Sequence, residues 1–206
     1  LKARDINVNV ADKMGLTPLH VAAQMGEVDA VAALIKAKGI DVDAISPLCR
    51  RFTPLHMAAE QGSDNVIAAL IAAEGVKVSA ADESGFTPLH VAAENNHGNA
   101  IAALLKARDI NVNVADKMGL TPLHVAAQMG EVDAVAALIK AKGIDVDAIS
   151  PLCRRFTPLH MAAEQGSDNV IAALIAAEGV KVSAADESGF TPLHVAAENN
   201  HGNAIA

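Results

Sequence analysis

The first half of the chain occurs twice. Residues 1–102 recur letter for letter as residues 105–206, so the two copies are offset by 104 residues. A shorter period lies inside each copy, because the tetrapeptide Thr-Pro-Leu-His recurs with spacings of 36, 34, 34, 36 and 34 residues. It begins at Thr17, Thr53, Thr87, Thr121, Thr157 and Thr191. A period near 34 residues indicates a solenoid, in which each unit packs mainly against its neighbours.

Each tetrapeptide predicts the start of a helix. The hydroxyl group of Thr17 can cap the helix, and Pro18 suits the first helical position because it needs no N–H group there. Gly26 supplies the left-handed residue at which this helix ends. A second helix is predicted over about residues 28–37, and the alternating residues 40–43 predict an extended piece that forms a projecting hairpin finger with the following turn. One repeat is therefore finger, helix, turn, helix.

The tetrapeptide, its period and the residues before it resemble the ankyrin repeat family. Asp12-Lys-Met-Gly15-Leu-Thr17 and Asp82-Glu-Ser-Gly85-Phe-Thr87 look like the Asp-x-x-Gly-x-Thr turn of that family. The resemblance covers essentially the whole chain and implies an all-α fold, a solenoid of stacked helix-turn-helix units with projecting β-hairpin fingers. The predicted units are the tail of a preceding repeat at 1–8, repeats at 9–42, 43–78 (long finger), 79–112, 113–146 and 147–182 (long finger), and a truncated repeat at 183–206.

Composition excludes several classes of protein. The chain has 16 Lys and Arg against 24 Asp and Glu, a net charge of −8, which argues against binding to nucleic acid. Charges interrupt every apolar run before the ~18 residues that a membrane span needs, so we expect no membrane insertion. Cys49 and Cys153 make no disulfide framework, and no signal-like segment opens the sequence. We therefore expect an intracellular, cytoplasmic protein.

The histidines raise the question of metal binding or catalysis. Six of the eight belong to the repeated tetrapeptide. Packed helices lie ~8 to 10 Å apart, so successive motif histidines are too distant to share a metal whose ligand bonds are ~2 Å long. The ankyrin resemblance implies instead that each hydrogen-bonds near the preceding Thr and tethers neighbouring turns. His97 and His201 open second helices, and we expect them to cap or bridge those helices.

No motif in the sequence indicates an enzyme. There is no His-Glu-x-x-His, no Gly-x-Ser-x-Gly, no phosphate-binding glycine loop and no Cys-x-x-Cys. We therefore predict no catalytic residue, no metal site and no cofactor.

The fingers of the second and fifth repeats depart from the pattern. Residues 45–53, Ile-Ser-Pro-Leu-Cys-Arg-Arg-Phe-Thr, are two residues longer than the usual turn and lack its Asp and Gly. Exposed arginines and apolar residues in such a loop indicate a binding site. In the alternative interpretation, the loop packs against the neighbouring finger and Arg50 pairs with an acid such as Asp43 or Asp82.

The ankyrin resemblance implies that a partner protein binds the concave strip formed by the fingers and the adjoining first helices. Apolar residues with flexible methionines on that strip are typical of a protein-binding site. The alternative is that these side chains pack finger against helix within the stack. The candidate partner-binding residues are Lys13, Met14, Leu16, Val21, Gln24, Met25, Leu48, Arg50, Arg51, Phe52, Met57, Gln61, Glu83, Phe86, Val91, Asn95, Met118, Leu120, Val125, Met129, Leu152, Arg154, Arg155, Phe156, Met161, Phe190 and Val195.

Two functions follow as hypotheses. The first is a non-enzymatic protein–protein interaction scaffold, whose acidic background favours a partner with basic residues around an apolar core. The second is a structural solenoid that self-associates end to end. Residues 1–4 match the tail of a second helix and residues 202–206 stop two residues short of a 208-residue double unit, so we expect terminal repeats without polar caps that stack into open polymers. A longer array and an engineered duplication both remain open as the origin of the exact repetition.

Overall fold

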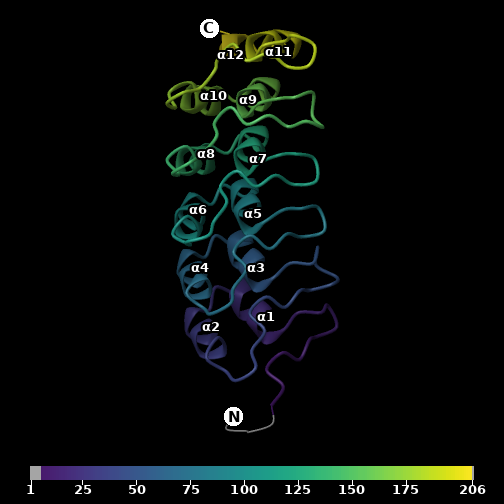
Figure 1. The fold of residues 1–206 in the computed structure, drawn as a ribbon, viewed down its shortest axis with the longest axis vertical. Helices are drawn as coiled ribbons and strands as arrows, with labels where there is room; N and C mark the ends of the chain where they lie inside the picture. The colour runs from purple at the N-terminus through teal and green to yellow at the C-terminus, as the bar shows by residue number, and fades with distance from the viewer. Residues whose placement is uncertain (1–5, 206) are drawn as a thin grey trace.

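The computed structural model describes residues 6–205, which form six helix pairs stacked along one axis (Figure 1). The first helices of the pairs form one column and the second helices form a parallel column. The first helices are α1 (Pro18–Gln24), α3 (Pro54–Glu60), α5 (Pro88–Glu94), α7 (Pro122–Met129), α9 (Pro158–Gln165) and α11 (Pro192–Glu198). The second helices are α2 (Val28–Leu34), α4 (Asp64–Ile71), α6 (Gly98–Leu104), α8 (Val132–Leu138), α10 (Asp168–Ile175) and α12 (Gly202–Ile205). The predicted all-α solenoid is confirmed.

The first helices of the repeats begin and end as the sequence predicts. Thr53 is extended and its hydroxyl oxygen accepts the backbone N–H of His56, while Pro54 occupies the first helical position of α3. Gly26 and Asn96 have φ angles of 72° and 59°, the left-handed conformation expected at the end of a first helix. The second helix of the first repeat is shorter than predicted. It ends at Leu34 and a turn follows it.

Stacking between repeats supplies the core. In the third repeat, Leu89, Ala92 and Ala93 of α5 and Ile101 and Leu104 of α6 have no solvent-exposed surface. Alanine at two of these positions lets first helices approach one another closely. Helices of two turns are marginal alone in water, so their stability comes from burial of these faces against neighbouring repeats.

The loops project to one side of the stack, but not as the β-hairpins expected from the sequence (Figure 1). The described residues contain no strand, and Ser150 and Phe156 form an isolated β-bridge. Residues 40–43, which alternate like a strand, form a turn. The carboxylate of Asp41 accepts the backbone N–H of Asp43 at 3.1 Å, and this local bond competes with strand pairing.

Gly85 and Gly75 provide a test of how closely neighbouring loops approach. Both have positive φ, 89° and 80°, so Gly→Ala costs about 1 to 2 kcal/mol of backbone strain at either position. A Cβ atom added at Gly85 would lie 2.8 Å from the backbone nitrogen of Lys117. A Cβ atom added at Gly75 would have no atom within 4 Å. We therefore expect Gly85→Ala to lower the free energy of unfolding by about 1 to 3 kcal/mol more than Gly75→Ala. Urea unfolding measures both, and equal losses would contradict the close contact of the loops.

Candidate functional site

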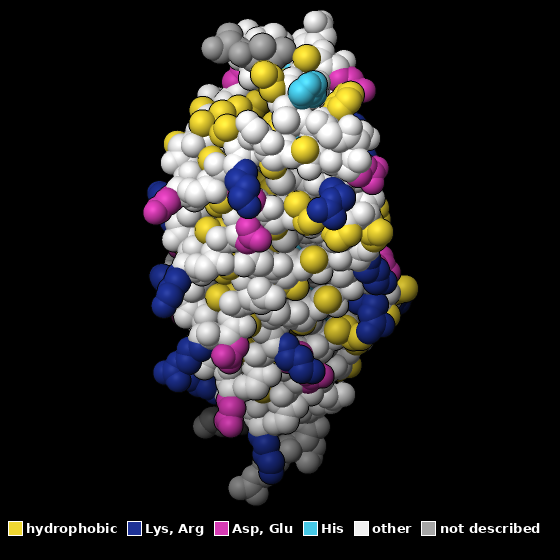
Figure 2. Space-filling view, turned by 45° about the horizontal axis from the view of Figure 1, so that its top comes forward, with side chains coloured by type: hydrophobic (Ala, Val, Ile, Leu, Met, Phe, Trp, Pro, Cys, Tyr) yellow, Lys and Arg dark blue, Asp and Glu magenta, His cyan; other side chains and the backbone are white. Residues whose placement is uncertain are grey.

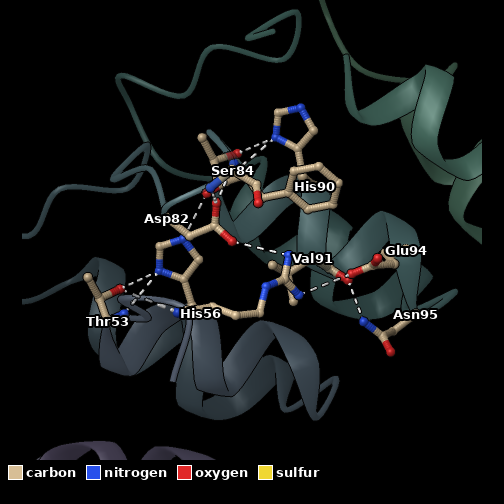
Figure 3. Close-up of polar contacts among 11 residues, drawn as sticks. Thr53, His56, Asp82, Ser84, His90, Val91, Glu94 and Asn95 are labelled. Carbon is tan, nitrogen blue, oxygen red and sulfur yellow. Dashed lines mark hydrogen bonds and ion pairs between the residues drawn. The ribbon is translucent and has the colours of Figure 1, made fainter. Parts of the chain in front are cut away.

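Motif histidines connect each repeat to the next loop. In the second repeat, Nδ1 of His56 accepts the backbone N–H of Thr53 at 3.1 Å, and its Nε2 lies 3.1 Å from the carbonyl oxygen of Phe86 (Figure 3). An acceptor at Nδ1 places the ring proton on Nε2, which then donates to that carbonyl group. His20, His90, His124 and His160 make the same pair of contacts, with the carbonyl oxygens of Phe52, Leu120, Phe156 and Phe190. The expected tether between neighbouring turns is confirmed.

Burial keeps these histidines uncharged. Desolvation lowers the pKa of His56 and of His124 to about 4, and it also lowers the pKa of His20, His90 and His160. The neutral ring is the form that can accept at Nδ1 and donate at Nε2 at the same time. Both ring nitrogens of His56 are thus occupied by backbone groups.

His97 and His201 bridge repeats at the turns between first and second helices. Nε2 of His97 lies 2.9 Å from the carbonyl oxygen of Glu60, and Nε2 of His201 lies 2.9 Å from that of Glu164. The expectation that they bridge is confirmed. His97 precedes α6 without a capping hydrogen bond from its side chain, so the capping interpretation is wrong at this position.

Hydrogen bonds between neighbouring loops join their tips into one continuous rim. The hydroxyl group of Ser46 donates to the carbonyl oxygen of Met14 at 2.9 Å. The backbone N–H of Glu83 donates to the carbonyl oxygen of Arg50 at 3.2 Å. The backbone N–H of Lys117 donates to the carbonyl oxygen of Ser84 at 3.1 Å. Ser150 and Glu187 repeat the first two contacts in the second copy. Ser46 was not among the candidates, although it is the one hydroxyl residue between Ile45 and Phe52.

Arg50 binds the long loop to the third repeat. Its guanidinium group lies 3.1 Å from the carboxylate of Asp82, whose side chain is fully buried, and 3.6 Å from that of Glu94 (Figure 3). It also lies over the rings of Phe52 and Phe86, 4.9 and 5.4 Å from their centres. The sequence left open whether Arg50 is free to bind a partner or pairs with a nearby acid. The structure shows that it pairs with Asp82. Arg154 makes the equivalent contacts with Asp186 and Glu198.

The structure buries eight of the candidate partner-binding residues, which corrects the expectation of a continuous exposed apolar strip. Val91 is 1% exposed whereas Val21, at the same position of the first described repeat, is 43% exposed, so the preceding repeat covers this position. Phe52 is 3% exposed because its ring stacks on His56 at 4.9 Å. At these positions the alternative, packing within the stack, is the correct one. The eight residues are Phe52, Met57, Val91, Leu120, Val125, Phe156, Met161 and Val195.

The other candidates reach the surface to different extents. Six are half-buried: Leu16, Gln24, Arg50, Phe86, Arg154 and Phe190. Thirteen are exposed: Lys13, Met14, Val21, Met25, Leu48, Arg51, Gln61, Glu83, Asn95, Met118, Met129, Leu152 and Arg155.

Two groups of exposed residues lie at the loop tips. We define tip site A as Lys13, Met14, Leu48 and Arg51, and tip site B as Lys117, Met118, Leu152 and Arg155. The two loops of site A touch, since a Cβ atom added at Gly15 would lie 2.5 Å from Cδ of Pro47. Lys117 was not among the candidates, although the exact repetition of Lys13 could have identified it. On the loop side, at the right of Figure 2, hydrophobic side chains lie beside Lys and Arg side chains.

Comparison with known families agrees with this geometry. The family model described as ankyrin repeats (3 copies) matches residues 1–82, 55–150 and 146–206, which together span the chain. The chain belongs to the ankyrin repeat family. A search of the curated proteins finds no match. Ankyrin repeat proteins are in general protein–protein interaction modules without enzymatic activity.

Metal centres and membrane-spanning helices are absent from the described part of this ankyrin solenoid. Within residues 6–205, no three His, Cys, Asp or Glu side chains are grouped so that they could hold a metal ion. Among the same residues, no helix has the length and apolar character needed to cross a membrane.

The buried histidines predict that acid destabilises this ankyrin solenoid. Between pH 6.5 and 4 the unfolded chain binds protons at His56 and His124 that the folded chain does not bind, so stability falls as the pH falls through this range. The expected loss at pH 5 relative to pH 7 is about 2 kcal/mol for each of these two residues. Urea unfolding at several pH values measures it. A free energy of unfolding that stays constant from pH 7 to pH 5 would show that the rings are not held neutral.

Arg50 and Arg51 form a matched pair for testing the contact between the long loop and the third repeat. Both have positive φ, 50° and 59°, so the backbone cost of Ala is similar at the two positions. Arg50→Ala leaves the buried carboxylate of Asp82 without its cation, and we expect a loss of about 2 kcal/mol in the free energy of unfolding. Arg51→Ala is expected to change it by less than about 0.5 kcal/mol. Thermal or urea unfolding compares the two, and equal effects would contradict the structural role of Arg50.

Proposed function

We propose that this chain is a non-enzymatic scaffold that binds a partner protein through its loop tips and the exposed ends of its first helices. The observation that carries the proposal is the exposure of large apolar side chains at the tips, 49% for Met14 and 66% for Leu48, on loops that neighbouring contacts hold in place. Exposed apolar groups on rigid elements are characteristic of protein-binding sites, because ordering them on binding costs little entropy.

Local charge at the tips favours an acidic segment of the partner. Lys13 and Arg51 are exposed and take part in no ion pair with any residue that the structure describes. Exposed charges are screened over about 8 Å at physiological salt, so the nearest charges outweigh the net charge of the chain. We therefore replace the basic partner suggested by overall composition with a segment that combines acidic and apolar residues, at least where it contacts the tips.

The proposal assigns no catalytic step to the chain. Support comes from the motif histidines, the residues most suited to acid–base chemistry, whose ring nitrogens are occupied by backbone groups and whose pKa is lowered by burial.

A selection from random peptides tests the proposal and requires no named partner. Short random peptides displayed on phage are selected on the whole chain and counter-selected on a variant carrying Leu48→Ser, Arg51→Glu, Leu152→Ser and Arg155→Glu. We expect the surviving peptides to be rich in acidic and apolar residues and to bind the variant at least about tenfold more weakly, a loss of about 1.4 kcal/mol.

The matched control carries the same types of change on the side of the second helices: Ile175→Ser, Val132→Ser, Lys106→Glu and Lys140→Glu. These positions are exposed as well, and we expect the selected peptides to bind this control as they bind the unchanged chain. Circular dichroism checks that both variants fold. If no peptide survives the counter-selection, or if the survivors are predominantly basic, the proposed surface is wrong.

End-to-end association is a second candidate function, favoured by one observation. Within the chain, α7 and α8 pack against α5 and α6, and the sequence of α5 and α6 recurs in α11 and α12 as far as residue 205. The contact between the two copies is thus a template for a contact between two chains. Light scattering across roughly a hundredfold dilution tests end-to-end association. A mass that grows with concentration supports association, and a constant monomer mass contradicts it.

A further inference from the structure

The apolar side chains of the two tip sites are equally exposed. Met14 and Met118 are each 49% exposed, and Leu48 and Leu152 are each 66% exposed. The neighbouring Arg50 and Arg154 lie 3.1 Å from Asp82 and Asp186, respectively. Because the sequence, the exposure of these side chains and the Arg–Asp contacts agree, a segment that binds tip site A is expected to bind tip site B with similar affinity. The first loop of site B differs in that Lys117 also contacts Ser84 of the third repeat.

The sites are also arranged in the same direction along one side of the stack. All the loops project to the same side, and each site occupies the first two loops of its own copy (Figure 1). Three repeats separate the two sites, which at ~10 Å for each packed helix layer gives a distance of about 30 Å.

The loop between the two sites keeps them separate. The tip of the third repeat carries Glu83 and Ser84, both exposed. Sites A and B instead carry Lys and Met in their first loop and Leu and Arg in their second loop. An acidic, apolar segment is repelled by Glu83 and finds no large apolar side chain there. The rim therefore offers two discrete sites for this kind of segment.

We propose that the chain binds both sites at once to a partner that carries the same acidic, apolar segment twice, in the same direction and about 30 Å apart. This inference rests on the proposed function, since it requires each tip site to bind a partner segment. Its added content is bivalence: once one segment is bound, the second binds from a high effective concentration.

Linked peptides test the bivalence directly. A peptide obtained by selection on the whole chain is synthesised alone, as two copies joined by a Gly-Ser linker of about 30 residues, whose average span is about 30 Å, and as two copies joined by about four residues, which reach only about 14 Å. Calorimetry is expected to show two single peptides bound per chain with similar affinities. The long-linked pair is expected to bind one per chain, at least about a hundredfold more tightly. The short-linked pair gains no more than about twofold, the statistical factor for two copies.

Half-site variants complete the experiment. Each variant leaves one site intact: one carries Leu48→Ser with Arg51→Glu, and the other carries Leu152→Ser with Arg155→Glu. We expect each variant to bind one single peptide with unchanged affinity. The long-linked pair is expected to bind these variants without its gain in affinity. Absence of any binding by the single peptide overturns the proposed function itself. Bivalence alone is overturned if two single peptides bind per chain but the long linker gives no gain in affinity. It is also overturned if only one single peptide binds per unchanged chain.

Discussion

The hydrogen bond from a motif histidine to the carbonyl group of the next loop holds the repeats in register. Five motif histidines make this bond: His20, His56, His90, His124 and His160. Nε2 of His90, for example, lies 3.0 Å from the carbonyl oxygen of Leu120, in the loop that begins the following repeat. The helices are too short to be stable alone, so the position of each helix pair depends on its neighbours. A buried bond repeated at every junction fixes that position. The same ring also accepts a backbone N–H at Nδ1, and this second contact requires an uncharged ring.

The same bond explains where the long loops place their extra residues. His56 reaches a carbonyl group 30 residues further on, and His20 reaches one 32 residues further on, but in both cases the acceptor is the residue before the next Thr. The base of the loop is thus held constant and the two extra residues are accommodated at the tip. Leu48 and Arg51 consequently lie in solvent, while Phe52 at the base is buried.

The sequence predicted the repeat, the helix starts and the left-handed helix ends, because Thr, Pro and Gly act locally at those positions. It did not predict that Val91 and Met57 are buried. The sequence pattern shows which face of a helix they occupy, but their burial depends on how closely the adjacent repeat packs. Residues 40–43 were misjudged because alternation favours a strand, whereas the Asp41 carboxylate favours a turn. The sequence therefore predicted the exposure of only part of the candidate partner-binding residues.

The most direct test of this account is the protonation state of the motif histidines, measured by long-range proton–nitrogen correlation NMR of their rings. We expect His20, His56, His90, His124 and His160 to carry one proton, on Nε2, at neutral pH, and His56 and His124 to remain neutral until the pH approaches their pKa of about 4. A proton on Nδ1 in place of Nε2 would show that the histidines do not donate to the neighbouring loops, and charged rings at pH 6 would show that Nδ1 does not accept the backbone N–H of the preceding Thr. The register of the loop tips would then need another explanation.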